Sequence, residues 1–133
     1  MSQESVEVVR NGIAAFMESE RLSEFFAPDV VWDMGTFSGW PGQSEFCGLD
    51  EFNDFLETWI KPYDRWSYEV EKIFDAGGNR VVVAVHQRGK PRGSDSWIDA
   101  SFAIIYTIEG ELIQRGQVYA STDEALEAAG LEE

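Results

Sequence analysis

Residues 98–119, IDASFAIIYTIEGELIQRGQVY, form the stretch of sequence that decides the fold. From residue 98 to residue 108 every second side chain is apolar, which is the period of a β-strand that buries one face. Glu109-Gly110-Glu111 then supplies a turn, and a last strand is expected over 112–119. The stretch therefore predicts two strands joined in a hairpin, with one apolar face.

Two further strands are predicted upstream of this hairpin. Apolar and polar residues alternate over 66–71, and the run 80–88 is rich in valine, which favours the extended conformation. Turn-forming residues at 75–79 and 89–94 separate these strands from each other and from the hairpin. The four strands are therefore expected to form an antiparallel meander.

Helices are predicted at both ends of the chain and in its middle. Apolar residues at spacings of three and four predict one helix over 6–16 and a longer one over 49–60. A short helix over 22–26 is expected to end before Pro28, because proline interrupts helical hydrogen bonding. The Ser-x-x-Glu capping box that opens 121–130 predicts a terminal helix.

A first strand and a long loop are predicted between these helices. The even-numbered residues of 30–34 share its apolar face, whereas Asp33 faces the other way. Residues 35–48 then turn to Gly, Pro, Ser and aromatic residues. This composition fits either a cover over a ligand or a surface loop that packs its own aromatic side chains, and both interpretations stay open.

This order of elements predicts a single α+β domain over residues 1–133, in which a curved sheet wraps around the helices. Aromatic residues line both the expected sheet and the long helix opposite it. The bulky side chains would therefore bring the sheet and the helix into contact at their ends while part of the space between them stays unfilled. An apolar pocket between them is expected.

The composition narrows the classes of partner. The 133 residues carry a net charge of −15, with 44% apolar and 14% aromatic residues, which disfavours nucleic acid and anionic ligands. A single cysteine, Cys47, and a single histidine give no metal-ligand spacing, so no metal and no cofactor are expected. No run approaches about 20 consecutive apolar residues and no export-type start is present, so we expect a cytoplasmic protein without a membrane partner.

Several short motifs support a family resemblance. They are SQE before VEVVR at 2–10, PDVVW at 28–32, GLDEF at 48–52, DAG before RVVV at 75–83, and DEALEAAGL at 123–131. Over essentially the whole chain they resemble the SnoaL-like branch of the nuclear transport factor 2-like superfamily, which shares its fold with ketosteroid isomerases. The resemblance implies a cone-shaped, cystatin-like roll of curved antiparallel sheet and a homodimer. It implies no single activity, because the superfamily hosts isomerases, cyclases, dehydratases, epoxide hydrolases and binding domains.

The catalytic residues of these relatives do not transfer to this chain. Ketosteroid isomerases place a carboxylate base late in the first strand, where this sequence has Met34. The acidic residue of their oxyanion hole falls on Ala103 or Ile104. The nearest likeness to the limonene epoxide hydrolases is His86 two residues before Arg88, with Asp99 on the next strand.

Two sets of candidate site residues follow. The residues expected to line the pocket and contact a ligand are Trp32, Met34, Phe52, Phe55, Trp59, Tyr68, Gln87, Phe102, Ile104 and Tyr106. His86 and Asp99 form a candidate acid–base pair, since histidine titrates near neutral pH and a carboxylate can orient it. Strict alternation places both on the face opposite Val83 and Val85, whereas a bulge would turn them inward.

Two functions therefore stay open. The first is binding of a small, mostly apolar and neutral ligand in an aromatic-lined pocket. The alternative is a cofactor-independent enzyme of the polyketide cyclase, isomerase or epoxide hydrolase type, with His86 and Asp99 as its acid–base pair. The outer face of the sheet, with Trp97 and Tyr119, is the expected surface of a homodimer.

Overall fold

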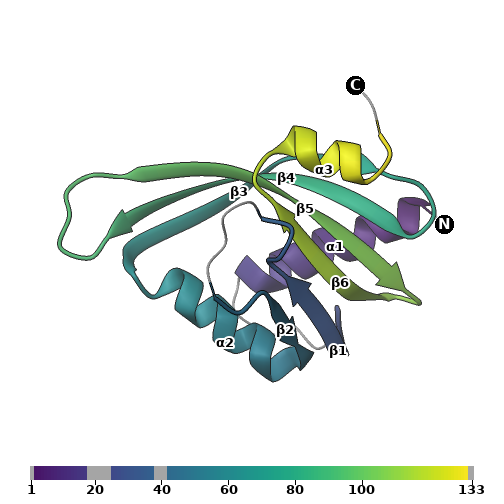
Figure 1. Cartoon of the computed structure of the whole chain (residues 1–133), viewed down its shortest axis with the longest axis horizontal. Helices are drawn as coiled ribbons and strands as arrows, with labels where there is room; N and C mark the ends of the chain where they lie inside the picture. The colour runs from purple at the N-terminus through teal and green to yellow at the C-terminus, as the bar shows by residue number, and fades with distance from the viewer. Residues whose placement is uncertain (1, 18–24, 38–41, 132–133) are drawn as a thin grey trace.

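The computed structural model of the chain describes residues 2–17, 25–37 and 42–131. Its helices and strands follow the predicted α+β order (Figure 1). They are α1 (Ser2–Met17), β1 (Phe26–Asp33), β2 (Glu45–Cys47), α2 (Gly48–Ile60), β3 (Tyr63–Asp75), β4 (Arg80–Pro91), β5 (Ile98–Glu109), β6 (Leu112–Tyr119) and α3 (Thr122–Ala128). None of the helices within these ranges is long and apolar enough to cross a membrane.

The six strands form one curved, open sheet in the order β2-β1-β6-β5-β4-β3. Strands β3 to β6 pair antiparallel as the predicted meander, and β2 pairs antiparallel with β1. The exception to an antiparallel sheet is the parallel pair of β1 and β6. No hairpin joins these two strands, which are far apart in the sequence, so local chain reversal does not fix their direction.

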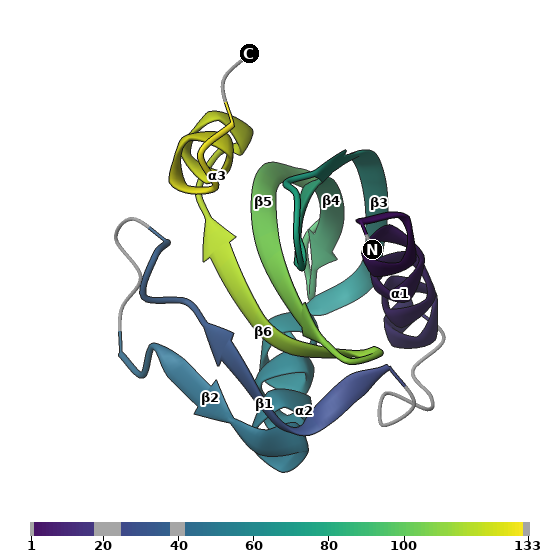
Figure 2. The same ribbon diagram turned by 90° about the vertical axis from the view of Figure 1, so that its right-hand side faces the viewer.

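Helices lie on both faces of the sheet (Figures 1 and 2). The inner face packs against α1 and α2, and its core includes Val9, Phe52 and Val83. The outer face packs against α3 around Val82 and Leu126. Cover on both faces explains why the run 81–85 is buried without interruption, although it was expected to bury only one face.

The ends of α3 follow the prediction from the capping box. The Ser121 hydroxyl accepts a hydrogen bond from the Glu124 backbone N–H at 3.2 Å. Beyond the helix, Gly130 has a φ of +82°, and the Leu131 N–H donates to the Leu126 carbonyl at 2.8 Å. These contacts satisfy backbone groups at both ends of α3. The short helix can then cover the apolar side chains around Val82 on the outer face of the sheet.

Two expectations for the region before α2 need correction. Phe26 opens β1 instead of belonging to a helix, and Pro28 lies inside that strand, where the register of β1 with β6 shifts between Phe26 and Val31. Residues 22–24 of the expected helix lie outside the described residues, and Phe25 lies in a turn. Within the expected loop, Glu45–Cys47 forms β2, which sequence patterns did not predict because it has only three residues. Trp40 lies outside the described residues.

Candidate functional site

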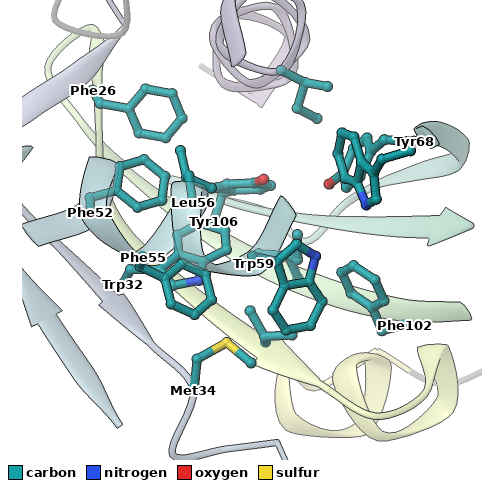
Figure 3. A pocket seen from close by; sticks show the side chains of 14 residues that line it. Phe26, Trp32, Met34, Phe52, Phe55, Leu56, Trp59, Tyr68, Phe102 and Tyr106 are labelled. Atoms are coloured by element: carbon teal, nitrogen blue, oxygen red, sulfur yellow. The ribbon is translucent and has the colours of Figure 1, made fainter. Parts of the chain in front are cut away.

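A small apolar cavity of about 40 Å³ lies between α2 and the inner face of the sheet (Figure 3). Its lining residues are Ile13, Phe26, Trp32, Met34, Phe52, Phe55, Leu56, Trp59, Trp66, Tyr68, Phe102, Ile104, Tyr106 and Val118. All of the predicted contact residues except Gln87 are among them. Their role as ligand contacts remains a prediction.

The sequence analysis missed several of the lining residues. Ile13 and Val118 come from α1 and β6, and Phe26 comes from the segment assigned to a helix. Trp66 had a usable signal, because it alternates with Tyr68 along β3 and so shares its face.

Trp32 is the central aromatic residue of the cavity wall. Its indole ring stacks on Phe52 with 4.9 Å between ring centroids, and its six-membered ring lies against Gly116 on β6. The side chain is 6% exposed, and its Nε1–H has no hydrogen-bond partner among the described residues. A buried donor without an acceptor is costly, so this atom favours a ligand or a water that carries an acceptor oxygen.

Tyr68 and Tyr106 bring the other polar atoms of the cavity close together. Figure 3 shows their hydroxyl groups pointing toward one another from β3 and β5, and the two interact by a side-chain hydrogen bond. Burial raises the pKa of Tyr106 and, together with the neighbouring Tyr106 hydroxyl, raises the pKa of Tyr68 well above its ordinary value. Both therefore stay protonated at physiological pH, and neither serves as a base there.

Gln87 lies on the inner face of β4 but next to the cavity instead of in its lining. Its Oε1 accepts hydrogen bonds from Trp59 Nε1 at 2.9 Å and from Trp66 Nε1 at 3.2 Å. The amide thereby holds one indole from α2 and one from β3 in fixed positions. We call these three side chains the indole clasp.

His86 and Asp99 meet, but on the outer face of the sheet. Nε2 of His86 lies 2.9 Å from Oδ1 of Asp99, and Nε of Arg88 lies 3.1 Å from the same oxygen. The Arg88 guanidinium also covers the Trp97 ring at 4.7 Å. Neither residue lines the cavity, as strict alternation along the strands predicts.

A second charged cluster ties the parallel strands together. Nη2 of Arg115 on β6 lies 3.0 Å from Oδ2 of Asp33 on β1 and 3.6 Å from Glu45 on β2. Asp33 Oδ1 also accepts a hydrogen bond from the Gly35 N–H at 2.7 Å. Asp33 faces away from the cavity, as predicted, and its partners satisfy both of its oxygens. Within the described ranges no group of His, Cys, Asp and Glu side chains could hold a metal ion.

Comparison with known proteins agrees with this fold. The model of the SnoaL-like domain matches residues 9–116, and no curated protein matches the sequence. Among solved structures, a nuclear transport factor 2-like protein of unknown function from Burkholderia pseudomallei has a TM-score of 0.73 at 18% identity, with 93% of this chain and 95% of that chain covered.

Two further solved structures were determined with small molecules. TerC co-crystallised with polyporic acid has a TM-score of 0.74 at 15% identity, covering 96% of this chain and 98% of that one. A protein with a ketosteroid isomerase-like fold from Catenulispora acidiphila, in complex with trimethylamine, has a TM-score of 0.62 at 18% identity, covering 84% and 81%. At these identities the likeness shows the fold alone. Because the family model matches most of the length of this chain, the chain belongs to the SnoaL-like domain family.

Proposed function

We propose that this SnoaL-like domain binds a small, mostly apolar and neutral ligand in its aromatic cavity. The observation that carries the proposal is the unpartnered Nε1–H of Trp32, a buried donor in a wall made almost entirely of aromatic and aliphatic side chains. Such a wall favours apolar surface at roughly 25 cal/mol per Å² buried. The indole N–H and the tyrosine pair supply orientation through neutral hydrogen bonds.

Charge supports a neutral ligand. The cavity is lined by no Asp, Glu, His, Lys or Arg side chain among the described residues, so an ion bound there would lose its hydration without a charged partner. The net charge of −15 adds a long-range field that repels anions. Two proteins of similar fold were solved with polyporic acid and with trimethylamine, which illustrates that this fold can hold small molecules.

The proposal is tested by titrating the protein with small aromatic hydrocarbons. Binding in the cavity is expected to change the intrinsic tryptophan fluorescence and to raise the melting temperature, because only the folded state holds the ligand. Trp97→Phe is the matched control, since this indole lies on the outer face. The change in fluorescence should survive in this variant and be much smaller in Trp32→Phe with Trp59→Phe, where Trp66 is the one described indole left in the cavity lining. An unchanged spectrum and melting temperature in the unmodified protein would refute the proposal.

The enzymatic alternative receives no support from the cavity. The His86–Asp99 pair lies on the opposite face of the sheet, so a substrate held among the aromatic rings is out of its reach. The residues that line the cavity offer no group that is a base at neutral pH. The catalytic pair therefore stays a prediction, which His86→Ala and Asp99→Asn would test on an identified substrate.

We also propose that the chain forms a homodimer through the outer face of its sheet. Helix α3 covers one end of that face, while Trp97, which is 40% exposed, lies toward the other end against the Arg88 guanidinium. Exposed large apolar side chains of this kind favour a protein interface. Sedimentation velocity on the protein and on Trp97→Ser tests this proposal: a dimer that the variant fails to form supports it, and a monomeric unmodified protein refutes it. A single folding domain over 1–133 and a cytoplasmic location are further proposals from the sequence.

A further inference from the structure

An open groove of about 590 Å³ lies directly beside the cavity, between α2 and the adjoining ends of β3 and β4. Its lining residues are Gln43, Phe46, Glu51, Asp54, Phe55, Thr58, Trp59, Pro62, Tyr63 and Gln87. Phe55 and Trp59 line both the groove and the cavity. These two rings therefore form the wall between them, and the indole clasp stands at its edge.

Gln87 presents two hydrogen-bond donors to this groove. An indole nitrogen carries a hydrogen and only donates, so Trp59 and Trp66 require the amide oxygen of Gln87 on their side. The amide NH₂ then points the other way, and Gln87 lines the groove. The residue is only 6% exposed, and its two hydrogen bonds from Trp59 and Trp66 both use the amide oxygen and leave the NH₂ group for the groove. A buried amide held in this orientation favours an acceptor oxygen in the groove.

The charges around the groove decide which acceptor fits. Glu51 and Asp54 line it from α2, and no Lys or Arg is among its described lining residues. A carboxylate or phosphate at Gln87 would therefore face negative groups without a compensating cation. A neutral carbonyl oxygen accepts the same hydrogen bond without that repulsion.

We propose that the groove is a second binding subsite, in which the Gln87 amide donates to the carbonyl oxygen of an uncharged ligand. The inference rests on the proposed function, because the apolar part of the same ligand packs on Phe55 and Trp59 and reaches toward the cavity. The volumes agree with this division. A cavity of about 40 Å³ can take only a small apolar part of the ligand, whereas the adjoining groove of about 590 Å³ has room for the remainder.

The test compares three probes of nearly equal size and shape: naphthyl methyl ketone, ethylnaphthalene and naphthoate. All carry the same aromatic ring system, and they differ in having a neutral acceptor, no acceptor and an anionic acceptor. Calorimetric titration of the full chain at pH 8 is expected to give the ketone an affinity about tenfold above that of ethylnaphthalene, as one additional hydrogen bond allows. Naphthoate should bind more weakly than the ketone.

Gln87→Glu tests the NH₂ donor of Gln87 separately from the acceptor oxygen that forms the indole clasp. A carboxylate keeps an acceptor for both indoles but removes the two N–H donors, so the ketone should lose its advantage and bind like ethylnaphthalene. Asp54→Asn removes one negative charge at the groove and should improve naphthoate binding. Asp50→Asn removes the same charge from an exposed position on α2 outside the groove lining, and should leave it unchanged.

The outcomes distinguish this inference from the proposed function. Equal affinity of the unmodified protein for the ketone and ethylnaphthalene overturns the subsite while leaving apolar binding intact, and this comparison does not depend on any variant folding. An unchanged ketone advantage in a folded Gln87→Glu protein also overturns it. If none of the three probes binds, the proposed function fails, and the subsite fails with it.

Discussion

Adding a single methyl group at Gly116 should force Trp32 out of its place. A Cβ built on Gly116 would overlap Cζ3 of the Trp32 indole and lie 2.6 Å from its Cε3. Carbon atoms in contact prefer about 3.5–4.0 Å, so the ring or the strand must move by about 1 Å. The ring cannot yield freely, because Phe52 stacks on it with centroids 4.9 Å apart.

Overpacking of this kind costs about 1–3 kcal/mol. We expect Gly116→Ala to lower the free energy of unfolding by about 2 kcal/mol, which in urea would move the midpoint down by roughly 1 M at a slope of about 2 kcal/mol per M. The displaced indole also stands in the cavity wall, so the affinity for an aromatic hydrocarbon should fall. Equilibrium unfolding in urea and ligand titration measure the two effects separately.

Gly12→Ala is the matched control on α1. Its Cβ would lie 2.9 Å from Cδ1 of Ile113, the end of a flexible side chain, and alanine favours a helix over glycine by about 1 kcal/mol. We therefore expect its stability to stay within about 1 kcal/mol of the original protein. A Gly116→Ala protein with unchanged stability and affinity would show that Trp32 does not occupy the position described.

Three further predictions concern other parts of the molecule. Ser121→Ala should lower the free energy of unfolding by about 1 kcal/mol through loss of the α3 cap, and Ser121→Asp should restore most of it; urea unfolding measures both, and equal stability of all three proteins would refute the role of the cap. Arg115→Met leaves the poorly solvated Asp33 carboxylate without its cation and should lower the free energy of unfolding by about 1–3 kcal/mol. Adding Asp33→Asn should recover part of that loss, and no recovery would show that the two charges are not coupled. Folding raises the pKa values of Tyr68 and Tyr106, so their contribution to the free energy of unfolding is complete below about pH 10. Above pH 10 this contribution is lost at up to about 1.4 kcal/mol per pH unit for each tyrosine. The urea midpoint should therefore fall less steeply above pH 10 in Tyr68→Phe with Tyr106→Phe than in the original protein.

The strands and the inward-facing residues were predictable because their signal is periodic. Alternation along β5 placed Phe102, Ile104 and Tyr106 on the inner face, where the structure has them. The same rule placed His86 and Asp99 on the outer face, where they meet. Alternation with a period of two depends only on the local backbone conformation, so it can be recognised in the sequence without knowledge of tertiary contacts.

The elements that sequence patterns did not predict depend on contacts between distant segments. Strand β2 is too short to show a period, and Phe26 joins β1 because a partner strand from the other end of the chain pairs with it. The indole clasp joins Gln87 to residues 28 and 21 positions away, at a distance that only the folded sheet and α2 determine. The close approach of Gly116 and Trp32 likewise requires the parallel register of β1 and β6.

The most direct test of ligand binding in the cavity is a proton–nitrogen correlation spectrum of isotope-labelled protein during titration with naphthyl methyl ketone. The five tryptophans give separate indole N–H signals, which single Trp→Phe substitutions assign. We predict that the signals of Trp32, Trp59 and Trp66 shift with one common dissociation constant, while that of Trp97 on the outer face stays in place. A Trp32 signal that does not move at saturation, or a shift confined to Trp97, would contradict the account.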